Sequence, residues 1–199
     1  MLKKKVSILF ITFLLSACQF KGESKEPQIM ISLDSEFDVT KYYSEQLFND
    51  IFYLNNLSHM ESEDTKTLRT YSEGYSSYIQ KDIFAKLEPE FLKITKGNYG
   101  DENKNKILEA NHQITFIVTK TYDYLHSSKK EVPKEYFNQL IDLNNILQTN
   151  STNELSLYNI EANQDEVGSK YENQIGAFLD TTIMKLKQLN QTIDEMNNK

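Results

Sequence analysis

The side chains that could perform catalysis are few in this chain and form no known catalytic pattern. The 199 residues include one cysteine, Cys18, and three histidines, His59, His112 and His126. No two histidines are four residues apart, as a helical zinc site requires, and the sequence has no glycine-rich phosphate loop or Gly-x-Ser-x-Gly motif. We therefore predict a protein that is not an enzyme and has no cofactor, with histidines that are solvated or cap helix ends.

One acidic stretch has part of the spacing of a calcium-binding loop. Asp34, Glu36 and Asp38 match loop positions 1, 3 and 5, and Glu45 matches position 12. However, Val39 occupies the position at which such a loop needs glycine for its sharp turn. The acidic side chains also suit the positive N-terminal end of a helix. We therefore predict no metal site.

Tyrosine is the residue type most suited to binding a partner in this sequence. Tyr71, Tyr75 and Tyr78 are spaced four and three residues apart, so they share one face of a predicted helix. A tyrosine offers a rigid ring with a polar tip, which explains its enrichment in binding surfaces. The alternative is that these rings close the edge of the core, with their hydroxyl groups in water. We take the three tyrosines as candidate partner-binding residues.

The N-terminus has the organisation of a bacterial export signal. Lys3, Lys4 and Lys5 precede a largely apolar stretch at residues 6–15, VSILFITFLL. At about 1.5 Å per residue this stretch spans roughly 15 Å, about half of a bilayer core. It therefore predicts a signal peptide and not a membrane-spanning helix.

The segment Leu15-Ser16-Ala17-Cys18 follows this stretch and resembles the lipobox of bacterial lipoproteins. The resemblance implies that Leu15, Ser16 and Ala17 are recognised by the signal peptidase, which cleaves before Cys18, and that the Cys18 thiol receives a diacylglyceryl group. Two or three acyl chains hold a protein stably at a membrane, since each buried CH₂ contributes about 0.8 kcal/mol. The alternative is an ordinary secretory signal followed by a free thiol.

These features predict a signal peptide at 1–17, a lipid-bearing tether at 18–37 and a folded domain at 38–199. Loss of the three lysines would change the formal net charge from −7 to −10. Such an acidic chain excludes nucleic acid as a partner, because phosphates require a basic face. A single arginine among 22 basic residues is typical of an AT-rich genome. It favours the outer leaflet of a Gram-positive cell membrane, with a Gram-negative outer membrane as the alternative.

A second resemblance lies at residues 48–53, FNDIFY. This stretch looks like the signature of small Gram-positive lipoproteins named for an Asn-Asp-x-x-Phe motif, with Tyr53 at the position of the Phe and Phe52 one residue early. The function of that family is unknown, so the resemblance implies a place at the membrane and no activity. Helical spacing puts Asn49 and Asp50 on the polar face, as candidate binding residues, and predicts partial burial of Phe52 and Tyr53.

Apolar residues recur at three- and four-residue spacing along most of the chain after residue 37, which is the pattern of helices with one buried face. The predicted helices are 38–60, 63–87, 102–126, 133–147 and 169–197. Because helices joined by short loops pack as antiparallel neighbours, we expect an all-α antiparallel bundle of four to five helices. The β-branched segment 114–119, ITFIVT, also suits a buried strand. We favour helix there because the apolar spacing continues on both sides.

Four of these helices have predicted N-terminal signals. Ser62 and Asp101 are candidate N-caps of the second and third helices. Pro133 suits the first position of the fourth helix, where its missing N–H costs nothing. Ser169 and Glu172 have the spacing of a capping box at the start of the last helix.

Two functions fit an anchored helical domain without catalytic motifs. The first is a surface lipoprotein that binds another protein, in an envelope complex, in toxin neutralisation or in exclusion of a competitor. It predicts a contiguous exposed patch of apolar and aromatic residues. The alternative is a carrier or sensor of a small ligand, which needs an enclosed cavity of about 300 Å³ or more between helices.

Overall fold

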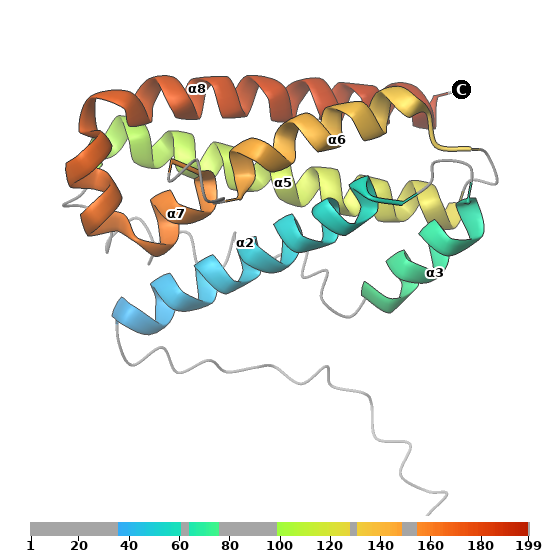
Figure 1. The fold of residues 1–199 in the computed structure, drawn as a ribbon, viewed down its shortest axis with the longest axis horizontal. Coiled ribbons are helices and arrows are strands. Elements are labelled where there is room, and N and C mark those ends of the chain that lie inside the picture. The colour runs from blue at the N-terminus through green and yellow to red at the C-terminus, as the bar shows by residue number, and fades with distance from the viewer. Residues whose placement is uncertain (1–35, 61–63, 76–98, 128–130, 149–154, 199) are drawn as a thin grey trace, which may run out of the picture. The chain divides into compact units, whose positions relative to one another are not determined.

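The computed structural model describes six helices and no strand in residues 36–60, 64–75, 99–127, 131–148 and 155–198 (Figure 1). The helices are α2 (Glu36–Ser58), α3 (Thr65–Tyr75), α5 (Gly100–Ser127), α6 (Lys134–Leu147), α7 (Leu157–Ala162) and α8 (Gln164–Asn197). The all-α fold class is therefore confirmed. Residues 114–119 are helical and belong to α5, so the strand alternative is excluded.

The pair of α5 and α8 has the most extensive contact between the described helices. On α5 the buried stripe includes Ile107, Ala110, Ile114, Ile117 and Thr121. On α8 it comprises Ile175, Leu179, Thr182, Leu186, Leu189, Ile193 and Met196. These are the positions at which the three- and four-residue spacing predicts burial.

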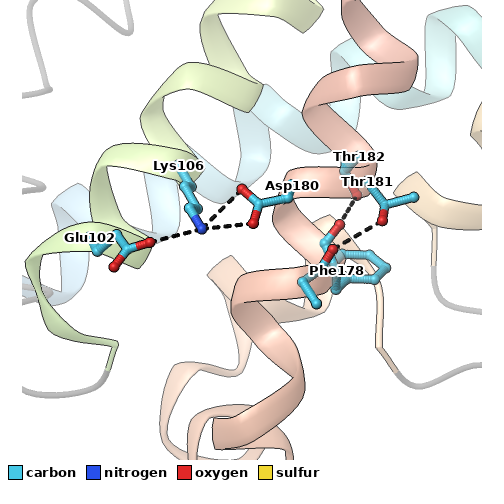
Figure 2. A network of polar contacts seen from close by, with 7 residues as sticks. Glu102, Lys106, Phe178, Asp180, Thr181 and Thr182 are labelled. Carbon is cyan, nitrogen blue, oxygen red and sulfur yellow. Dashed lines mark hydrogen bonds and ion pairs between the residues drawn. The ribbon is translucent and has the colours of Figure 1, made fainter.

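Ion pairs between α5 and α8 show that the two helices run in the same direction. Lys106 Nζ lies 2.9 Å from Asp180 Oδ1, and Lys120 Nζ lies 2.7 Å from Asp194 Oδ1. The contacts thus advance together along both helices. Figure 2 shows Lys106 between Asp180 and Glu102, a residue of its own helix whose Oε1 is 3.0 Å away.

α6 runs antiparallel to α8 and lies between α5 and α8 in the chain. Thr192 of α8 donates a hydrogen bond to Gln139 Oε1 of α6, at 3.0 Å, while the later Met196 lies beside the earlier Phe137. The main contacts of α6 are with α8 and α2, and its Tyr136 hydroxyl also lies 2.8 Å from Thr121 Oγ1 of α5.

The start of α3 differs from the prediction. Asp64 Oδ1 accepts a hydrogen bond from the Thr67 N–H at 3.0 Å, so Asp64 supplies the cap. Ser62, and the part of the predicted second helix after Tyr75, lie outside the described residues. Similarly, α5 begins at Gly100, whose φ of 70° is easily adopted by glycine, and this puts Asp101 inside the first turn and not at the cap.

In the last third of the chain, too, the helices begin at residues other than those predicted. Pro133 is the N-cap of α6 and not its first residue. The capping box was wrong, because α8 begins at Gln164 and the Ser169 hydroxyl donates to the Asp165 carbonyl at 2.8 Å inside the helix. Tyr171 interrupts the helical backbone of α8 with φ −121° and ψ 18°, close to the predicted start.

α2 begins at Glu36, two residues before the predicted domain boundary. The signal peptide, the lipobox with Cys18 and nearly all of the predicted tether lie outside the described residues, as does Tyr78. Among the residues that the structure describes, no helix is long and apolar enough to cross a membrane.

Candidate aromatic binding groove

An open groove lies between α2 and α3. It has a volume of about 560 Å³ and is lined by Asn49, Phe52, Thr70, Tyr71, Gly74 and Tyr75. Phe52 is 49% exposed, whereas Tyr71 and Tyr75 are partly buried and pack on the core. Three of the predicted binding residues, Asn49, Tyr71 and Tyr75, are therefore brought together in this groove.

A buried tyrosine holds the two groove tyrosines in place. The ring of Tyr53 stacks on that of Tyr75 at 4.4 Å and on that of Tyr71 at 5.7 Å between centroids. Its hydroxyl is 2.7 Å from Ser72 Oγ, and Asn56 donates a hydrogen bond to the Tyr71 hydroxyl at 3.0 Å. Burial raises the pKa of Tyr53 and of Tyr71, so both hydroxyl groups keep their protons. The groove wall is thus fixed before any partner binds.

A second open hollow of about 360 Å³ adjoins the first. It is lined by Glu45, Phe48 and Asn49 of α2 and by Tyr158 of α7. The ring of Phe48, which is 48% exposed, lies 6.1 Å from that of Phe52 and 5.6 Å from that of Tyr158. We call the surface formed by Phe48, Phe52, Tyr71, Tyr75 and Tyr158 the aromatic face. Asn49 lines both of its hollows.

Asp50 does not belong to this surface, and its predicted place on the polar face was wrong. The side chain is only 3% exposed and accepts a hydrogen bond from Gln46 Nε2 at 3.1 Å. Burial raises the pKa of its carboxyl to about 7. The reason is that α2 contacts α5, α6 and α7, so more than one face of the helix is covered. The partial burial predicted for Tyr53 and Phe52 was also wrong, because Tyr53 is fully buried and Phe52 is exposed.

Phe48, Phe52 and Tyr158 are the surface residues that sequence reasoning missed as candidates. Phe48 and Phe52 are four residues apart and lie off the buried stripe that includes Leu47 and Ile51. That four-residue spacing was the available signal, because it puts both rings on one side of the helix. Tyr158 had no such signal, since it reaches the surface through the folding of a short helix, α7.

The histidines do not converge on a common site. His126 stacks on Tyr122, at 3.9 Å between ring centroids, and its Nε2 is 3.7 Å from Glu73 Oε1. His59 is exposed at the end of α2, and His112 is half-buried near the middle of α5. Within the part of the chain that the structure describes, no group of three or more His, Cys, Asp or Glu side chains could hold a metal ion. In the acidic stretch with part of the spacing of a calcium loop, the side chains before residue 43 lie outside the described residues.

The interior contains two features that bear on ligand binding. An enclosed, apolar cavity of about 10 Å³ lies among α2, α3, α5, α6 and α8, which is at most the size of one water molecule. Glu161 of α7 is fully buried near Asn111, and burial raises the pKa of its carboxyl well above the usual range. We therefore interpret the neutral, buried carboxyl of Glu161 as part of the packing between helices and not as a ligand-binding group.

Comparison of the chain with models of protein families, with curated proteins and with solved structures finds no match. The two resemblances drawn from short sequence motifs therefore stay predictions.

Proposed function

We propose that this protein is a membrane-anchored surface lipoprotein whose helical domain binds another protein through the aromatic face. The anchor in this proposal is the lipid on Cys18, after cleavage at the segment Leu15-Ser16-Ala17. The binding site is the groove between α2 and α3 together with the adjoining hollow.

The observation that supports this function most directly is the exposure of Phe48 and Phe52 beside a preformed tyrosine wall. Two half-exposed phenylalanine rings four residues apart, next to Tyr71 and Tyr75, expose apolar area to water. Surfaces of this kind mark sites of interaction with other proteins. Aromatic residues in a concave, rigid setting also supply most of the binding energy in known interfaces.

The runner-up function, a carrier of small ligands, has less support. The cavity described among α2, α3, α5, α6 and α8 has a volume of about 10 Å³, far below the roughly 300 Å³ that a small-ligand pocket needs. The larger hollows on the aromatic face are open, which suits a protein surface better than an enclosed ligand.

Site-specific cross-linking in cells tests the proposed function. A photoreactive phenylalanine analogue would replace Phe52 in the full-length chain, and the cross-linked products would be identified by mass spectrometry. Phe116 of α5 offers a matched control, because it is 53% exposed and lines neither hollow. We expect one dominant envelope or secreted protein to be linked at position 52 and not at position 116.

Two other outcomes would contradict the proposal. Cross-links from position 52 only to the same chain, including its residues 76–98, or to a second copy would mean that the aromatic face serves folding or self-association. Equal capture of the same proteins at positions 52 and 116 would mean that contact with the groove is not specific.

A further inference from the structure

The six-residue helix α7 is joined to α8 through one residue. Asn163 is the C-cap of α7 and also the N-cap of α8, and its φ of −127° and ψ of 49° are not helical. In Figure 1, α7 lies at the end of the bundle where α8 begins. Because so short a helix has little stability of its own, its position depends on the contacts that it makes with the rest of the domain.

Apolar side chains and one hydroxyl hold α7 against the domain. Leu157 and Ile160 are fully buried, and α7 packs on α2, α8 and α6. The hydroxyl of Tyr99, the residue before α5, donates a hydrogen bond to the Ile160 carbonyl at 2.6 Å and lies 3.2 Å from the Gln164 carbonyl. These two carbonyls lie on either side of Asn163 in the chain, so Tyr99 fixes the bend between the two helices.

The one acidic residue of α7 is buried without a cation beside it. Glu161 is fully buried, and the polar group next to its carboxyl is the amide of Asn111 on α5. This amide lowers the pKa of the carboxyl, but burial raises the pKa by more. Neither carboxyl oxygen has a hydrogen bond of standard geometry. A carboxylate at this place would therefore be costly, and the docked helix retains the proton.

The titratable groups around α7 do not offset a charge on Glu161. Burial, and then the charges of Glu161 and of Asp165 on α8, raise the pKa of Tyr99, so its hydroxyl stays neutral. On α2, Glu45 lines the hollow beside Tyr158, and the pKa of Asp50 responds to burial and to its own neighbour on that helix. Within the described parts of α2, α6 and α8, no charged side chain contributes to the pKa of Glu161.

We propose that α7 is a pH-sensitive switch, which stays docked while Glu161 carries its proton and leaves the bundle when that proton is lost. In the released helix the carboxyl is in water, where the ordinary pKa of a glutamate is 4.5. The docked state binds the proton more tightly, so its free energy rises relative to the released state as the pH increases above that value.

Release of α7 would alter the aromatic face. Tyr158 is three residues before Glu161 on the same helix, and its ring centroid lies 5.6 Å from that of Phe48. When α7 leaves, this ring contact is lost, and with it one wall of the smaller hollow. The switch goes beyond the proposed function, because it concerns the position of the helix and requires no partner.

The fluorescence of a single tryptophan tests the switch, since the natural sequence contains no tryptophan. Tyr158→Trp in the full-length chain reports whether position 158 is packed or in water. The emission maximum is followed from about pH 5 to about pH 9, a range above the ordinary pKa of a carboxyl group. Circular dichroism at each pH monitors the other helices.

We expect the emission of this reporter chain to move to longer wavelength as the pH rises, while the bundle stays helical. Glu161→Gln and Glu161→Met cannot ionise, so each should abolish the shift. Glu166→Gln, at an exposed position of α8, is the matched control and should leave the shift unchanged. Asp50→Asn should also retain the shift, which separates Glu161 from the buried acid of α2.

Three results would overturn the switch. A constant emission maximum in the reporter chain would mean that α7 stays docked throughout. A shift that persists in the Glu161 variants would assign the change to another group. A shift that coincides with loss of the bundle's helical signal would mean global unfolding. None of these results decides whether the aromatic face binds a protein, which cross-linking from position 52 tests separately.

Discussion

At the scale of single residues, the buried carboxyl of Asp50 makes stability depend on pH. Burial raises its pKa from 3.8 to about 7. The folded state therefore keeps a proton that the unfolded chain loses as the pH rises from about 4 to about 7. The free energy of unfolding falls over this window and stays lower above it, by roughly 4 kcal/mol at about 1.4 kcal/mol per pKa unit.

Asp50→Asn should remove this pH dependence, because the amide cannot ionise and can still accept the hydrogen bond from Gln46. We expect the variant to gain stability relative to the parent chain progressively from pH 4 to pH 7. Urea unfolding followed by circular dichroism at several pH values measures this difference. The exposed Asp142 provides the control, since Asp142→Asn should leave the difference near zero at every pH. A gain for Asp50→Asn that is the same at all pH values would contradict the assignment.

The sequence predicted some residues of the candidate site and not others for an identifiable reason. Tyr71 and Tyr75 were predicted because their spacing alone puts them on one face of α3. The burial of Asp50 could not be predicted, because it depends on how many other helices cover α2. The four-residue spacing of Phe48 and Phe52 puts both rings on one side of α2. Whether that side is exposed depends on which other helices cover it, and the spacing does not show this.

At the scale of secondary structure, the six-residue helix α7 depends on its N-cap. Ser156 is fully buried, and its hydroxyl oxygen accepts a hydrogen bond from the Asn159 N–H at 3.1 Å. This helix presents Tyr158 to the aromatic face. Such a short helix has little internal stability, so the cap has a large share in its formation.

Ser156→Ala should therefore lower the free energy of unfolding by about 1 kcal/mol. Ser156→Thr, which retains the capping hydroxyl, should recover part of this loss. Ser127→Ala is the control, because Ser127 is exposed and bonds to a carbonyl of its own helix, α5. Urea titrations of the three variants measure the effect, and equal losses at positions 156 and 127 would speak against a capping role.

Helix positions were predicted better than helix ends. The apolar stripes of α5 and α6 located these helices to within two residues of their bounds, because spacing along the chain is a local property. The predicted capping box failed, although Tyr171 breaks the helical backbone nearby. Asp165 and Glu166 in the first turn already suit the positive helix end, so the chain becomes helical before Ser169.

At the scale of the whole molecule, the proposed lipid anchor on Cys18 predicts that replacing this one residue changes where the protein is found. In Cys18→Ser the single thiol of the chain is absent, so the lipid has no site of attachment. We expect the variant to move from the membrane fraction to the medium or the soluble envelope fraction. Cell fractionation with an antibody to the domain, beside labelling with a fatty acid, measures this. A variant that stays in the membrane fraction would refute the lipid anchor.

The arrangement of the helices was only partly predictable. The sequence predicted antiparallel packing of helices, and α6 does run antiparallel to α8. The contact between α5 and α8 joins segments that are separated by α6 and α7. Nothing in local spacing shows that two such distant stripes meet side by side.

The contact between α5 and α8 also has the repeat of a parallel coiled coil. The buried residues on both helices alternate three- and four-residue steps, which is a heptad repeat and produces a left-handed supercoil. Lys106 and Lys120 are 14 residues apart, as are their partners Asp180 and Asp194, so the two ion pairs mark the same register two heptads apart.

A heptad repeat by itself does not fix that register, because a slip by seven residues again aligns apolar positions. The charges make the slipped states unfavourable. A slip of α8 by one heptad in one direction would bring Lys106 opposite Lys187, and a slip in the other direction would bring Lys120 opposite the same residue. In the observed register Lys187 instead meets Glu109, at 3.0 Å. The lysines and acids along this seam therefore specify one alignment of two helices whose apolar residues would permit several.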